Sequence, residues 1–191
     1  MKKKLLIVFV FMTLGIKAQF NETTLIYGTI DVNLGNYLGI EANINYINKE
    51  KYSFKIGYSG YIRATKYAPS DYKGGFYFRA HDRLGNYHLL VGRIYNLDKR
   101  KKIRTNIALG LGYLIVREPI NWELKGDRKQ YYTYDYGRVN TMSIILNPKI
   151  EFLFTNSYGL YISPTLMISK DKTYIGLGVG QLFRIIKKYK H

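Results

Sequence analysis

Seven charged residues of this 191-residue chain lie inside segments that otherwise alternate between apolar and small polar residues, and their types could support chemistry. They are Asp31, Glu41, Lys55, Arg63, Arg104, Lys149 and Glu151. If these segments are strands of one sheet, all seven fall on its polar face. Acids and bases enclosed together pair with one another, because an unpaired buried charge is costly. Pairing is therefore the favoured interpretation, and a path for protons, ions or a small ligand is the alternative.

Other kinds of site have little support in the sequence. There is no Cys, which excludes thiol nucleophiles and Cys-based zinc sites. Gly110-x-Gly112 and Gly176-x-Gly178-x-Gly180 lie within alternating segments with no helix after them, so they lack the setting of a nucleotide-binding loop. Asp82, Asp127 and Asp135 are too scattered for a calcium loop. We therefore expect neither a cofactor nor a metal.

The elements that must position these residues are β-strands, because the side chains alternate with a period of two along most of the chain. The pattern predicts eight strands, at residues 24–32, 37–47, 52–63, 87–96, 103–115, 141–154, 160–169 and 174–185. Leu89, Leu90 and Val91 make the facing of the fourth strand ambiguous, and we expect Arg93 to point inward. Pro148 falls on the apolar side, where a bulge or a rim position is expected.

The links between these strands differ in length. Those at 48–51, 97–102 and 155–159 are short, and those after the first and seventh strands are tight. Those at about 64–86 and 116–140 are long. The fifth and sixth strands could extend into the second long link as a hairpin, which also holds Trp122 and the tyrosines at 131, 132, 134 and 136. Phe76-Tyr77-Phe78 in the first long link could form an extra strand, which would give ten strands.

The N-terminus has the pattern of a secretory signal peptide. Three lysines precede a mostly apolar stretch from Leu5 to Ile16, and Ala18-Gln19 leads into a polar chain. The apolar stretch is shorter than the ~20 residues of a transmembrane helix. We therefore predict a signal peptide at 1–19 and one domain at 20–191.

Composition and strand length favour a barrel in a membrane. The formal net charge is +17, and the basic residues concentrate in links such as 99–102, while the apolar faces carry almost no charge. Strands of about ten residues or more suit a tilted crossing of the bilayer. The resulting prediction is all-β: an eight-stranded antiparallel transmembrane barrel with its polar face inside. The alternative is a soluble periplasmic barrel with the apolar face inside, binding an apolar ligand. The predicted signal peptide argues against a nucleic-acid partner, which leaves lipopolysaccharide phosphates and anionic lipid.

This pattern resembles the small outer-membrane β-barrels of the OmpA/OmpX type, in the form common in Bacteroidetes. In that family the last strand carries an assembly signal, and Gly180, Phe183 and Ile185 match its glycine and its two apolar positions. Gly178 stands where the family's signal has a polar residue, and a basic tail, residues 186–191, follows the signal. The resemblance implies an outer-membrane location and recognition by the barrel assembly machinery.

The resemblance also includes barrels that deacylate or acylate lipid A with a His and a Ser. His81 and His88 are not followed by the His-x-Ser motif of the deacylases, and Ser70-Asp71 shares only a long link with His81. The sequence therefore favours a non-enzymatic outer-membrane protein with a filled polar lumen, acting through its two long loops. A lipid A-modifying enzyme remains the alternative.

Overall fold

The computed structural model describes residues 24–72, 80–125, 132–155 and 157–188. The predicted signal peptide and Phe76-Tyr77-Phe78 lie outside this part of the chain. Within it, no helix is long and apolar enough to cross a bilayer.

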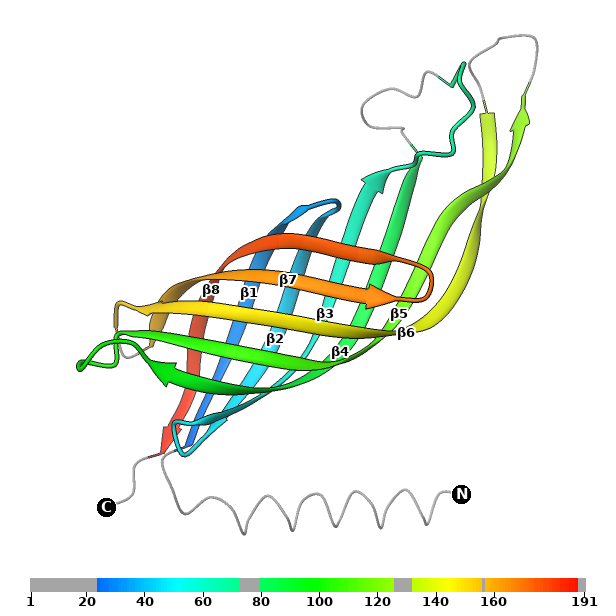
Figure 1. Cartoon of the computed structure of the whole chain (residues 1–191). Coiled ribbons are helices and arrows are strands. Elements are labelled where there is room, and N and C mark those ends of the chain that lie inside the picture. Colours follow the sequence, from blue (N-terminus) through cyan, green and yellow to red (C-terminus); the bar gives the residue numbers. More distant parts are fainter. Residues whose placement is uncertain (1–23, 73–79, 126–131, 156, 189–191) are drawn as a thin grey trace, which may run out of the picture.

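Eight antiparallel strands form a closed barrel in chain order (Figure 1). They are β1 (Thr24–Gly35), β2 (Leu38–Asn48), β3 (Tyr52–Ala64), β4 (His81–Asn96), β5 (Ile103–Leu124), β6 (Tyr132–Leu153), β7 (Tyr158–Ser169) and β8 (Thr173–Lys188). Pairing of β1 with β8 closes the ring, so every strand has two neighbours. The predicted eight-stranded barrel is confirmed for the residues that the structure describes.

The two faces of the wall differ sharply in chemistry. On β2, Ile40 and Ile44 are 66% and 55% exposed on the outside, whereas Glu41 and Asn43 are each 5% exposed on the inside. The same alternation recurs around the ring, which gives an apolar outer wall and a largely polar interior. A soluble barrel requires the reverse arrangement, so the soluble alternative is wrong.

One strand faces the other way from our prediction. In β4, Leu90 and Ile94 are buried, whereas Arg93 is exposed on the outer wall. The inward placement of Arg93 was wrong because a shift of one residue in facing exchanges all inner and outer side chains. As a consequence, His88 of β4 also lies inside the barrel.

Pro148 occupies neither a bulge nor a rim. The ladder between β6 and β7 runs from Ser143↔Ser169 to Leu146↔Leu166 and resumes in the same register at Ile150↔Ile162. That register sets Pro148 opposite Pro164 within the gap. Proline has no N–H to donate, so two facing prolines interrupt the ladder without shifting it.

The connections define two ends of the barrel. The hairpin end carries the connections at 36–37, 65–80, 125–131 and 170–172. The terminal end carries the other turns, the start of β1 and the end of β8. The predicted link at 116–140 is mostly strand, because β5 and β6 continue beyond their neighbours as a two-stranded hairpin (Figure 1). β4 pairs with β5 only as far as Arg83↔Arg117, so the hairpin leaves the barrel wall beyond that level.

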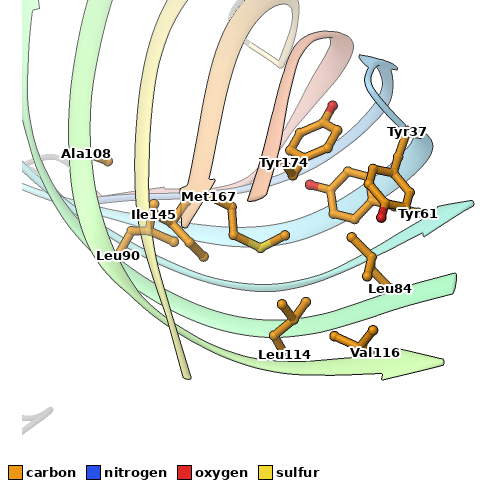
Figure 2. Packing of buried hydrophobic residues seen from close by; sticks show 10 residues of the cluster. All are labelled: Tyr37, Tyr61, Leu84, Leu90, Ala108, Leu114, Val116, Ile145, Met167 and Tyr174. Atoms are coloured by element: carbon orange, nitrogen blue, oxygen red, sulfur yellow. The ribbon is translucent and has the colours of Figure 1, made fainter. Parts of the chain in front are cut away.

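Apolar side chains fill both ends of the lumen. From the hairpin end to the middle of the lumen, rings and aliphatic side chains from six strands and the β1–β2 turn point inward (Figure 2). This cluster comprises Tyr37, Tyr61, Leu84, Leu90, Ala108, Leu114, Val116, Ile145, Met167 and Tyr174. A second cluster at the terminal end comprises Leu25, Tyr27, Ile47, Ile94, Tyr161 and Leu182. The Glu41–Lys55 pair therefore lies between the ends that these clusters fill, whereas the Arg63–Asp82 pair lies beyond Tyr61 and Leu84 at the hairpin end.

Candidate functional site

A lysine–glutamate pair occupies the middle of the lumen. Lys55 Nζ on β3 donates to Glu41 Oε1 on β2 at 2.8 Å, and also to Asn147 Oδ1 on β6 at 2.8 Å. Lys55 and Glu41 are 4% and 5% exposed. The Lys55 side chain thus reaches across the lumen and links β3 to β6, which are not neighbours in the ring.

Two further polar side chains complete this centre. Asn43 Nδ2 donates to Glu41 Oε1 at 2.8 Å, and its Oδ1 lies 2.7 Å from His88 Nε2. His88 Nε2 is also 3.7 Å from Glu41 Oε1. Sequence reasoning missed His88 because the facing of β4 was misjudged, although Asn86 and His88 alternate there with Tyr87 and Leu89.

Asn147 links this centre to the interrupted β6–β7 ladder. Its Nδ2 group donates to Ser163 Oγ at 2.8 Å and to Thr165 Oγ1 at 2.7 Å, both on β7. These bonds cross the gap that Pro148 and Pro164 leave. The side chain of Asn147 therefore replaces part of the missing backbone pairing.

We expect Asn147→Ala to lower the free energy of unfolding by about 1–3 kcal/mol, because Lys55 loses an acceptor and two hydroxyls lose a donor. Urea titration of the protein folded in phosphatidylcholine vesicles measures the change. Asn96→Ala, at an exposed position at the end of β4, is the control. Equal stability of the two variants would contradict a bridging role for Asn147.

A second charged centre lies nearer the terminal end. Glu151 on β6 accepts from Arg104 Nε on β5 and from the hydroxyl of Tyr27 on β1, the latter at 2.8 Å. Lys149 Nζ is 3.9 Å from Glu151 and 4.3 Å from the centroid of the Tyr161 ring. Glu151 is fully buried, so three groups on three strands depend on this one carboxylate.

Asp31 has neutral donors as its nearest partners. Tyr161 donates its hydroxyl proton to Asp31 Oδ2 at 2.6 Å, and Asn33 Nδ2 donates to Oδ1 at 2.6 Å. Arg63 lies apart from the other six predicted lumen residues, toward the hairpin end. There it pairs with Asp82 at 2.6 Å and lies 4.3 Å from the Tyr37 ring centroid.

Little open space remains around these residues. The pocket at the Glu41–Lys55 centre has a volume of about 10 Å³. A cavity needs roughly 10–15 Å³ by this measure to hold one water molecule. Side chains thus fill this part of the lumen.

Among the described residues, no hydrogen bond or ion pair joins Ser70, Asp71, His81 and His88, the residues considered for lipid A chemistry. His88 is enclosed in the lumen, with Asn43 and Asn86 as its hydrogen-bond partners. Asp71 accepts both of its hydrogen bonds from the hydroxyl of Tyr132, at 2.7 and 2.8 Å, and this bonding raises the pKa of Tyr132. The described residues include no group of three or more potential metal ligands.

Aromatic rings gather on the projecting hairpin. Trp122 lies 4.8 Å from Tyr134 and 5.1 Å from Tyr72 between ring centroids, and Tyr134 lies 5.6 Å from Tyr136. Tyr72 comes from the connection between β3 and β4, so the rings join both long connections. We call Tyr72, Trp122, Tyr132, Tyr134 and Tyr136 the aromatic cluster. Tyr131 of the sequence prediction lies outside the described residues.

The predicted assembly signal falls on β8. Gly180 lies opposite Asp31 of β1, and Phe183 is exposed on the outer wall. For Ile185, the structure describes the backbone as part of β8. Its role in assembly stays a prediction.

The fold is that of the small eight-stranded outer-membrane β-barrels of the OmpA/OmpX type. The chain is similar to the N-terminal barrel domain of Pseudomonas aeruginosa OprF, with a TM-score of 0.56 and 12% identity over 86% of this chain and 98% of that one. It is also similar to Yersinia pestis Ail in a phospholipid bilayer nanodisc, with a TM-score of 0.51 and 11% identity over 84% and 99% of the chains. For Neisserial surface protein A the values are 0.50 and 11%, over 85% and 96%.

These likenesses establish the fold alone, because identities are near one residue in ten. No family model matches the chain, and a search of curated proteins finds no match. Function must therefore be argued from the residues themselves.

Proposed function

We propose that this protein is a non-enzymatic, non-conducting barrel of the outer membrane that holds the β5–β6 hairpin at the cell surface for interaction. The observation that carries this proposal is the filled lumen. Its charged middle leaves about 10 Å³ at the Glu41–Lys55 centre, and apolar clusters close both ends. Such a lumen offers no continuous aqueous path.

Placement in a membrane is supported by the outer wall. Ile40, Leu89, Leu109 and Ile175, on four different strands, are 57–66% exposed. A continuous apolar wall is stable against hydrocarbon, and a closed barrel leaves no unpaired strand edge there. The terminal end, with its short turns, then faces the periplasm, and the hairpin end faces outward. The assembly machinery, acting on the β8 signal, and outer-leaflet lipopolysaccharide are the partners that this location implies.

A surface role is supported by the contrast between the two ends. The terminal end has only short turns, whereas the hairpin end carries the aromatic cluster beyond the barrel. Aromatic side chains supply large contact area at low entropic cost, which is why they are enriched at interfaces. Solvent-exposed loops on a rigid scaffold commonly carry binding functions.

Single-channel recording in planar bilayers tests the closed lumen. We expect the folded protein to give no steady conductance steps, because the charged pairs and apolar clusters leave no water column. The double variant Glu41→Ala/Lys55→Ala is the comparison, since it removes the central pair and opens space. Regular steps from the unmodified protein would contradict the proposal.

A further inference from the structure

Three arginines form a row across the outer wall at the hairpin end. Arg83 of β4 is the register partner of Arg117 of β5, and Arg117 is the partner of Arg138 of β6. All three side chains are exposed on the outside. Like charges directly opposite one another on a sheet are destabilising. Their alignment therefore calls for a compensating negative charge.

The protein does not supply that charge among its described residues. None of the carboxylates there lies within 4.0 Å of Arg83, Arg117 or Arg138. Arg138 Nε donates to the neutral Oδ1 of Asn140 at 3.1 Å, and the Arg83 guanidinium lies 4.9 Å from the ring centroid of Tyr136. By contrast, the interior arginines Arg63 and Arg104 each have a carboxylate partner.

An apolar groove begins beneath this row. It has a volume of about 620 Å³, crosses the outer wall from β1 to β5, and includes Arg83 and Arg117 in its lining. This volume is in the usual range of ligand pockets, roughly 300–1,000 Å³. The rest of the lining is mainly apolar, with Val32, Leu38, Ile40, Ile62, Tyr87 and Ile115 among its members.

Two facing glycines create the depth of the groove. Gly60 of β3 is the register partner of Gly85 of β4, so no side chains rise from the wall at that point. A Cβ added at Gly60 would come no closer than 3.7 Å to another residue, at Tyr58. At Gly85 an added Cβ would lie 3.0 Å from the hydroxyl of Tyr58, so the Tyr58 side chain covers part of the glycine floor and forms a side of the groove.

From these features we infer that the outer wall from β1 to β6 is a binding site for a phosphorylated acyl lipid of the outer leaflet, namely the lipid A part of lipopolysaccharide. Acyl chains occupy the groove over Gly60 and Gly85, and phosphate groups meet the arginine row. Guanidinium groups bind phosphate with paired hydrogen bonds. The aromatic cluster continues outward from Tyr136, at the level of the lipid's sugars.

This inference rests on the proposed location in the outer membrane. Charge complementarity and position both select the occupant, because a ligand of the outer wall must itself reside in the membrane. A soluble anion would match the arginines alone and would leave the groove unfilled.

Native mass spectrometry of the full chain, purified in detergent and titrated with diphosphoryl lipid A, tests the site. We expect saturable binding that weakens about tenfold or more in the triple variant Arg83→Gln/Arg117→Gln/Arg138→Gln, because charge-assisted hydrogen bonds are lost. The matched control is Lys99→Gln/Arg100→Gln/Lys102→Gln, which removes the same charge at the terminal end and should bind as the unmodified protein does. Equal weakening in both triple variants would overturn the site.

Filling the groove tests the acyl part separately. Gly60→Phe should also weaken lipid A binding about tenfold while the arginine row stays intact. Equal affinity for phosphatidylglycerol, or unchanged binding in Gly60→Phe, would overturn the assignment to lipid A. The shift of the folded band on an unheated SDS gel is recorded for every variant. Loss of that shift in the unmodified protein would refute the membrane barrel itself, whereas a shifted band without lipid A binding would refute only this site.

Discussion

Replacing Glu151 with Ala is expected to lower the free energy of unfolding by about 3–5 kcal/mol, because it leaves buried charge without its partner. Arg104 and Tyr27 both donate to this carboxylate, and Lys149 lies 3.9 Å from it. After the substitution, the buried Arg104 and Lys149 side chains would both lack this carboxylate. Urea titration in phosphatidylcholine vesicles measures the loss.

The control for this effect is Glu50→Ala. Glu50 pairs with Lys101 across two turns of the terminal end, and both side chains are largely exposed. Exposed pairs contribute about 0–1 kcal/mol, so the control should stay near the unmodified protein. A Glu151 variant no less stable than the Glu50 variant would show that the lumen charges do not hold the barrel together.

The second large effect is expected at Gly110, where Gly110→Val should prevent most of the chain from closing into a barrel. A Cβ at this position would lie 2.0 Å from the carbonyl oxygen of Leu89 and 2.6 Å from the Cα of Leu90. Both are backbone atoms of β4, so relief requires the β4–β5 wall to move. Overpacking of this kind costs about 1–3 kcal/mol where side chains can yield, and more where they cannot.

The readout for Gly110→Val is the fraction of heat-shifted band after refolding. Gly60→Ala is the control, because an added Cβ there meets no atom of another residue closer than 3.7 Å. We expect the control to fold like the unmodified protein. Normal folding of Gly110→Val would mean that β4 and β5 do not approach as closely as the structure has them.

Alternation of side chains predicted eight strands, with ten left open, and composition together with strand length predicted that the apolar face points outward. It succeeded on β2 and β3 because every second residue there is apolar, so only one facing buries the polar set. The prediction of facing failed on β4, where three apolar residues in a row obscure the alternation. The polar residues Asn86 and His88 indicated the correct inner face there, but we gave more weight to Arg93, which lies on the opposite face.

The pairing of charges inside the lumen could not be predicted from the sequence. Glu41 and Lys55 lie on adjacent strands, but Lys55 also reaches Asn147 across the lumen, and Tyr27 meets Glu151 from a strand 124 residues away. Such contacts depend on how the ring closes and staggers, which local patterns do not encode. The arginine row was hidden for the same reason, since Arg83, Arg117 and Arg138 are aligned only by register.

The interruption of the β6–β7 ladder was indicated in the sequence by two prolines, but only one of them was considered. Pro148 alone suggested a bulge or a rim, as the absence of an N–H usually requires. Pro164 lay in the next predicted strand, at a position that the register sets opposite Pro148. Two prolines facing each other remove donors on both sides, so the strands keep their register and a side chain, Asn147, supplies the bonds.

The extension of β5 and β6 carries the aromatic cluster a defined length of strand beyond the barrel wall. Residues 118–124 of β5 have no partner on β4, and at roughly 3.4 Å per residue they run about 24 Å along the strand beyond the last shared pair. A large soluble partner could therefore contact the aromatic cluster without touching the apolar outer wall of the barrel.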